Sequence, residues 1–256
     1  MHSNQLTLQL NRLYFIDAVR AFAILMMLQG HFIDTLLASE YRDSNHLVFN
    51  TWQYFRGITA PVFFTVSGLI FTYLLIKANS KGALYYRMRR GVVRGLMLIG
   101  IGYALRIPIF RWLNGSFGTY FLVIDVLQII GVSLILIVGI YALCQKKTLF
   151  FSVVMFCIGT LIFLSEPLYR TYGAEGVPLL FANYISKVNG SIFTVFPWFG
   201  YVAFGAFIAT LFYGYLVRPK FKPAIVIGFF SVGLVLIYGS SSGLHWLSIQ
   251  TDRKSV

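Results

Sequence analysis

The feature that most constrains this sequence is a series of long apolar runs. Each is close to the roughly 20 mainly apolar residues that a helix needs to cross a bilayer. The strands of a membrane β-barrel would instead alternate apolar and polar residues over about 10 positions, whereas these runs are continuous. The sequence therefore predicts an all-α, polytopic transmembrane helix bundle of about seven spans, at residues 15–38, 57–76, 92–110, 119–143, 148–165, 190–214 and 223–241.

The composition excludes an ordinary soluble enzyme. Only 11% of the residues are charged, against roughly 25% in a soluble domain, and the mean hydropathy is +0.75. The segments between the runs are short, so we expect a single membrane domain over residues 1–256. The net charge of +13 does not predict a nucleic-acid partner, because the basic residues of a polytopic protein gather in its cytoplasmic loops.

The distribution of basic residues predicts a cytoplasmic N-terminus. With Arg20 inside the first run, that orientation places twelve Lys and Arg residues in cytoplasmic segments and eight on the opposite side. Six of the twelve lie between Lys77 and Arg94, close to the ends of two runs, where basic residues act most strongly on orientation. No cleavable signal peptide is recognisable at the N-terminus. We expect a multi-pass protein of a bacterial inner membrane, in contact with membrane lipids.

The first run carries four ionisable residues on one helical face. Arg20 and His31 are eleven residues apart, which leaves them about 20° from the same azimuth and about 16 Å apart along the axis. Asp17 precedes Arg20 by three residues, which is pairing distance on a helix. Asp34 follows His31 by three residues and is placed to accept its ring proton. These four residues are called the polar stripe below.

The polar stripe has both a structural and a functional interpretation. Asp17 and Arg20 could form an interfacial ion pair, and His31 could bond to a neighbouring helix. However, a charged residue at the bilayer centre costs about 2.5–3.5 kcal/mol on insertion scales, so such residues usually face a cavity or a partner. Imidazole titrates near pH 6.5 and can accept a proton from an attacking hydroxyl or amine. His31 is therefore the leading candidate for a catalytic base.

Five motifs, in order along the chain, resemble a known family. They are RLYFIDAVRAFAILMMLQGH, RGITAPVFFTVSGLIFTYLL, YYRMRRGVVRGLMLIGIGYALR, IDVLQIIGVSLIL and FPWFGYVAFGAFIATLF, and they cover residues 12 to about 213. Together they resemble the membrane-bound acyltransferase superfamily, in particular its heparan-alpha-glucosaminide N-acetyltransferase-like branch, which is related to the family-three O-acyltransferases. Arg20 and His31, with ten residues between them in an ID-x-x-R context, are the most specific single element, and the ordered set of five motifs carries the likeness.

The resemblance implies an integral membrane acyltransferase. Such enzymes move an acyl group, usually acetyl, from a cytoplasmic donor such as acetyl-CoA to a sugar hydroxyl or amine across the membrane. His31 would then be the base or a transient acyl carrier, with Asp34 holding its tautomer. Arg20 would contact the donor or position Asp17. Arginine forks bind phosphate well, so the CoA head group is the implied ligand of Arg87, Arg89, Arg90 and Arg94. A topogenic patch facing anionic lipids explains the same arginines equally well.

Three residues of later runs are candidates for binding the acceptor. Asp125 and Gln128 lie three apart on one helical face and could hydrogen-bond a glycan, although a helix–helix contact explains them too. Trp198 could form the floor of a sugar-binding site or simply pack against neighbouring helices. No metal is expected, because Cys144 and Cys157 show no metal-ligand spacing.

Two other functions are compatible with the sequence. A transporter or flippase of a sugar- or lipid-linked substrate would use the polar stripe as its pathway, although we find neither repeated halves nor paired broken spans. A catalytically silent partner subunit is the second, because members of the superfamily usually continue through further spans. This sequence stops at Val256, either as a true extracytoplasmic end or as a shortened form. O- and N-transfer, acetyl and longer acyl groups, and monomer and homo-oligomer all remain open.

Overall fold

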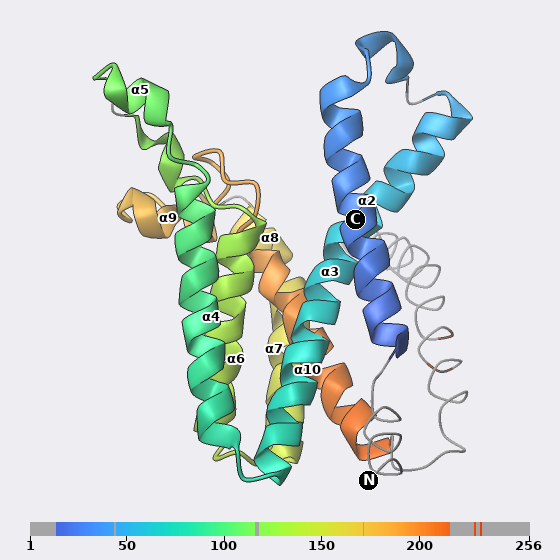
Figure 1. The fold of residues 1–256 in the computed structure, drawn as a ribbon, viewed down its shortest axis with the longest axis vertical. Coiled ribbons are helices and arrows are strands. Elements are labelled where there is room, and N and C mark those ends of the chain that lie inside the picture. Colours follow the sequence, from blue (N-terminus) through green and yellow to red (C-terminus); the bar gives the residue numbers. More distant parts are fainter. Residues whose placement is uncertain are drawn as a thin grey trace, which may run out of the picture. The chain divides into compact units, whose positions relative to one another are not determined.

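The computed structural model describes residues 14–43, 45–115, 118–170 and 172–215, together with Gly228 and Ser231. Within these residues all regular structure is helical and no strand occurs (Figure 1). This confirms the all-α prediction. The chain divides into two compact units, Met1–Thr210 and Leu211–Val256, and nearly all described residues belong to the first. Apart from Gly228 and Ser231, the predicted span 223–241 lies outside the described residues.

Six long helices occur among the described residues, and each coincides with one of the first six predicted spans. They are α2 (Tyr14–Leu36), α3 (Leu47–Ser80), α4 (Leu84–Ala104), α6 (Val126–Leu143), α7 (Thr148–Leu164) and α10 (Val195–Tyr215). Shorter helical segments lie between them: η1 (Ser39–Tyr41), α5 (Ile109–Leu113), η2 (Thr119–Leu122), α8 (Glu166–Arg170) and α9 (Leu179–Ile185). Figure 1 labels all but the two 3-10 segments.

Four helical segments among the described residues are long and apolar enough to cross a membrane: Asp17–Leu36, Leu47–Ser80, Thr119–Leu143 and Val195–Gly214. The N-terminal half of α4 is more polar, because it carries four arginines. With 17 residues, α7 is about 26 Å long, somewhat short of a hydrocarbon core of about 30 Å. These helices indicate an integral membrane protein, and the count of seven spans stays a prediction.

Glycines allow α4 and α6 to pack backbone against backbone. A Cβ atom added at Gly95 would lie 2.6 Å from the carbonyl oxygen of Gly131, and one added at Gly131 would lie 2.5 Å from that of Gly95. Gly91 faces Val138 and Gly102 faces Gln128, so the two helices run antiparallel. Small residues at such contacts are typical of membrane bundles, in which van der Waals packing holds helices together.

A second close contact joins α3 to α10. A Cβ atom at Gly68 would collide with the backbone carbonyl of Val202, and one at Gly205 would collide with that of Thr65. The first turns of α2 join this contact, since Val19 packs against a buried cluster formed by Val66, Leu69 and Ala209. The N-terminal part of α2 is thereby placed beside α3, where Arg20 can meet the arginines of α4.

Candidate active site

The polar stripe of α2 contributes to two different places. Arg20, near the start of the helix, lines a cavity together with arginines of α4. His31 and Asp34 lie about three turns further along the helix and are not among that cavity's lining residues. Asp17 is exposed one turn before Arg20. The stripe therefore does not form one continuous site.

Three arginines line what we call the cationic cavity. It has a volume of about 410 Å³, and Arg20 of α2 meets Arg87 and Arg94 of α4 around it. The remaining lining residues come from α3, α4 and α6: Ser67, Ile70, Phe71, Leu74, Met97, Leu98, Ile130 and Leu134. No acidic residue occurs among these described lining residues. Positive charges that converge on apolar walls repel one another, so the cavity favours a ligand with several negative charges.

Arg87 shows this electrostatic situation most clearly. It lies before the apolar run 92–110, and its guanidinium carbon is 5.7 Å from the centroid of the Phe71 ring. Its Nε is buried without a hydrogen-bond partner among the described residues. Burial lowers the pKa of Arg87, and the positive charges of Arg94 and Arg90 lower it further. A bound anion would offset this repulsion and supply the missing acceptor.

The other two arginines of the predicted CoA group lie elsewhere. Arg89 and Arg90 are exposed, and neither is among the residues that line the cationic cavity. The Arg90 guanidinium carbon lies 4.6 Å from the centroid of the Tyr86 ring. The structure thus separates the four arginines into two that face the cavity and two that face outward.

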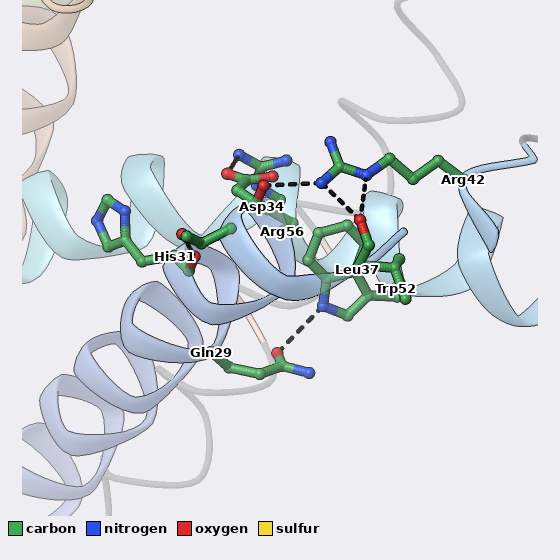
Figure 2. Close-up of polar contacts among 8 residues, drawn as sticks. Gln29, His31, Asp34, Leu37, Arg42, Trp52 and Arg56 are labelled. Carbon is green, nitrogen blue, oxygen red and sulfur yellow. Dashed lines mark hydrogen bonds and ion pairs between the residues drawn. The ribbon is translucent and has the colours of Figure 1, made fainter. Parts of the chain in front are cut away.

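The C-terminal end of α2 is tied to α3 by two polar contacts (Figure 2). Arg56 of α3 forms an ion pair with the Asp34 carboxylate. One turn earlier on α3, the Trp52 Nε1 donates to Gln29 Oε1 at 3.2 Å, and the Arg56 guanidinium carbon lies 5.3 Å from the Trp52 ring centroid. Arg42 caps α2 by donating to the carbonyl oxygen of Asp34 at 2.7 Å.

His31 lies between these contacts without joining them. In Figure 2 its imidazole points away from Asp34, and no side-chain hydrogen bond of His31 is found among the described residues. Its carbonyl oxygen accepts from Thr35 Oγ1 at 2.6 Å. The Asp34 carboxylate pairs with Arg56 rather than with the imidazole as expected from helical spacing. A guanidinium presents a planar fork of donors that matches a carboxylate, which explains the preference.

Asp125 and Gln128 begin helix α6. Asp125 is the N-cap residue, and its side chain accepts from the Val126 N–H at 2.7 Å. Gln128 Oε1 accepts from the Asp125 N–H at 3.2 Å, which completes a capping box. The other carboxylate oxygen of Asp125 pairs with Arg106 Nη2 at 2.7 Å. Because this pattern is readable as D-x-x-Q before an apolar run, the sequence contained a signal for the cap.

Asp125 also faces a second cavity, which we call the neutral cavity. Its volume is about 650 Å³, and its lining residues are Leu105, Arg106, Ile107, Pro108, Tyr120 and Asp125. Gln128 is buried and is not among them. The sequence does not predict Arg106 and Tyr120 as site residues, because their positions depend on how the turn after α4 folds back onto the start of α6.

Trp198 lies in an aromatic cluster. Its ring centroid is 5.1 Å from that of Phe64, 4.7 Å from that of Phe193 and 5.7 Å from that of Tyr201. It lines neither the cationic cavity nor the neutral cavity. This environment corresponds to the packing interpretation of Trp198.

A match over most of the sequence decides the class of protein. The family model for the catalytic region of heparan-alpha-glucosaminide N-acetyltransferase matches residues 12–251. The chain belongs to this family. Neither a curated protein nor a solved structure matches it.

Membership in the heparan-alpha-glucosaminide N-acetyltransferase family confirms the predicted resemblance and makes the chain a membrane acetyltransferase. The matched region contains the polar stripe, both cavities and the cap of α6. Among the described residues, no group of three or more His, Cys, Asp or Glu is arranged to hold a metal ion.

Proposed function

We propose that this protein transfers an acetyl group from cytoplasmic acetyl-CoA to a hydroxyl or amine of an extracytoplasmic glycan. The observation that carries the proposal is the cationic cavity, in which Arg20, Arg87 and Arg94 converge with no acidic residue among the described lining residues. Coenzyme A carries several phosphates, and arginine binds phosphate through charge-assisted hydrogen bonds. The family match supports the same reaction class.

The walls of the cationic cavity suit the rest of the donor. Beyond the arginines, its lining is largely apolar and reaches Ile130 and Leu134 in the middle of α6. In this proposal, Arg87 and Arg94 hold phosphate oxygens at the start of α4. Arg20 adds a third contact from α2. The pantetheine arm would then extend along the apolar wall between α3, α4 and α6.

His31 is the proposed proton acceptor. The acceptor oxygen or nitrogen attacks the thioester carbonyl carbon, the C–S bond breaks, and the coenzyme leaves as the thiol. The acceptor's proton passes to the His31 imidazole and then to the leaving sulfur. In a second version of the step, His31 is itself acetylated and then passes the acetyl group to the acceptor. The unpartnered imidazole of the described structure is compatible with either role.

Asp34 and Asp17 have supporting roles in this proposal. Asp34 acts through its ion pair with Arg56, which positions the end of α2 that carries His31. Asp17 lies one turn before Arg20 and would orient its guanidinium toward the donor. The outward-facing Arg89 and Arg90 would contact anionic lipids at the cytoplasmic face of a bacterial inner membrane.

The test compares an arginine of the cavity with one outside it. Purified protein is given radiolabelled acetyl-CoA and a glucosaminide acceptor, and the KM for acetyl-CoA is measured for Arg94→Gln and Arg89→Gln. A hydrogen bond to a charged group contributes about 1.5–3 kcal/mol, so Arg94→Gln should raise this KM about ten- to a hundredfold. Arg89→Gln removes the same charge from the same helix and should leave the KM within about twofold of the wild-type value.

Three results would contradict the proposal. Equal effects of the two variants would show that the cavity does not hold the donor. Uptake of a sugar into proteoliposomes without consumption of acetyl-CoA would indicate a transporter, and an absence of both activities would indicate a silent partner subunit.

A further inference from the structure

The neutral cavity shares no lining residue with the cationic cavity. It is lined by residues that follow the last turn of α4 and by residues that precede the first turn of α6. None of its lining residues belongs to α2 or α3, so it is distinct from the region of His31. At about 650 Å³, it lies within the range of roughly 300–1,000 Å³ that is usual for small-ligand sites.

Charge balance distinguishes the two cavities. In the neutral cavity, Arg106 is paired with Asp125 at 2.7 Å, and the Arg106 side chain is only 13% exposed. The pair contributes no net charge, so the cavity does not attract a phosphate in the way the cationic cavity does. A ligand here must instead be neutral and must satisfy fixed hydrogen-bonding groups.

The orientation of these hydrogen-bonding groups is fixed by the fold. Asp125 is held by the Val126 N–H as well as by Arg106, because it caps α6. Arg106 donates one N–H group to Asp125, and no other acceptor for its guanidinium is found among the described residues. A ligand in the cavity therefore meets a preformed guanidinium–carboxylate pair without having to order it.

The remaining walls offer apolar and aromatic surface. Tyr120 is 62% exposed, and its ring centroid lies 5.6 Å from the Arg106 guanidinium carbon. Leu105, Ile107 and Pro108 complete the lining. A pyranose ring combines a face of C–H groups with a rim of hydroxyls, so it can lie against an aromatic or apolar wall while its rim bonds to charged groups.

We infer that the neutral cavity is an accessory subsite for a neutral sugar residue of the acceptor glycan, separate from the residue that receives the acetyl group. This inference rests on the proposed glycan acceptor. It implies that the enzyme binds a polymeric or oligomeric acceptor at two places, near His31 and in the neutral cavity. Long acceptors gain affinity from the second contact, whereas a single sugar bound near His31 does not.

The test uses acceptors of two lengths and a substitution that removes only the aromatic wall. The longer acceptor is a tetrasaccharide with one terminal glucosamine and three uncharged N-acetylglucosamine residues. Tyr120→Leu should raise the KM for this tetrasaccharide about tenfold and leave the KM for methyl glucosaminide and for acetyl-CoA unchanged. Tyr120→Phe retains the ring and should behave as wild type. Phe110→Leu is the matched control, because Phe110 is 83% exposed in the adjacent α5 and does not line the cavity.

A second variant tests the cavity without relying on Tyr120. Ile107 is another lining residue, so Ile107→Trp fills part of the space and should raise the KM for the tetrasaccharide alone. Equal KM changes for the two acceptor lengths, or none for either, would overturn the subsite. The expected changes count only for variants that keep the melting temperature of the wild type.

Calorimetry separates failure of this inference from failure of the proposed function. The tetrasaccharide is titrated into wild type and Tyr120→Leu without any donor. Weaker binding by Tyr120→Leu supports the subsite even if no acetyl transfer is detected with any acceptor. Equal binding by both proteins overturns the subsite even if transfer proceeds normally.

Discussion

His31 lies between two contacts that hold the end of α2 against α3, yet its imidazole joins neither of them. Gln29 bonds to Trp52 on one side of it, and Asp34 pairs with Arg56 on the other. This arrangement fixes the backbone around the ring and leaves the ring nitrogens without a side-chain partner among the described residues, so that the unprotonated nitrogen can accept a substrate proton.

The residue-scale prediction concerns His31→Ala. Removal of a general base typically costs about 10²–10⁴ in rate, so transfer should fall by at least a hundredfold while expression and membrane insertion stay normal. Added imidazole should restore part of the activity, because it can occupy the vacated space and accept the proton. Phe32→Leu, at the next position of α2, is the control and should retain full rate. Full activity of His31→Ala would exclude both versions of the proposed step.

The polar stripe also shows what helical spacing can and cannot predict about single residues. Both Arg20 and His31 lie in α2, and spacing predicts that they share one face, because that relation depends only on the helical repeat. Spacing paired Asp34 with His31, its neighbour on the same helix, whereas the carboxylate is taken by Arg56 of α3. A partner on another helix has no fixed sequence separation, so the sequence alone could not identify it.

At the scale of elements, glycine positions decide how closely α4 and α6 approach. Gly131→Ala places a methyl group against the backbone of Gly95, and overpacking of this kind costs about 1–3 kcal/mol. The melting temperature in detergent should fall by several degrees. Because Ile130 and Leu134 line the cationic cavity on either side of this contact, affinity for acetyl-CoA should fall as well.

Gly139→Ala is the control for this prediction, since it changes the same residue type on the same helix. No atom lies within 4 Å of a Cβ added at Gly139, and Ala is about 1 kcal/mol more favourable than Gly in a helix. Gly139→Ala should therefore leave the melting temperature unchanged or raise it. If both variants lowered it equally, the close contact between α4 and α6 would not be the cause.

The apolar runs predicted which segments are helical better than they predicted which helices pack together. The first six runs all became helices, although the boundaries moved: α3 extends beyond the run 57–76 at both ends, and α4 begins eight residues before the run 92–110. Hydropathy indicates only which residues can contact lipid. A helix can also include charged turns, such as Leu84–Arg90 at the start of α4, and a hydropathy pattern does not detect them. Arg20, Arg87 and Arg94 converge because of the way α2 and α4 pack beside α3. The positions and lengths of the apolar runs do not predict this packing.

At the scale of the whole molecule, α4 links the two cavities. The helix contains 21 residues and is about 30 Å long. The cationic cavity is lined by α4 residues from Arg87 to Leu98, and the neutral cavity follows the last turn of α4. A donor that is charged and a glycan that is not would then reach the protein from opposite sides of the membrane.

This division of roles requires that the turn between α3 and α4 be cytoplasmic, as the dense basic block from Lys77 to Arg94 predicts. Single cysteines test it in a Cys157→Ser background, because Cys157 is exposed and Cys144 is buried. In spheroplasts, a membrane-impermeant maleimide should label Asn114→Cys directly, and should label Ser80→Cys only after permeabilisation. The background protein without an added cysteine should stay unlabelled in both conditions. The reverse pattern would place the three cavity arginines on the side that acetyl-CoA does not reach, and the proposed direction of transfer would be wrong.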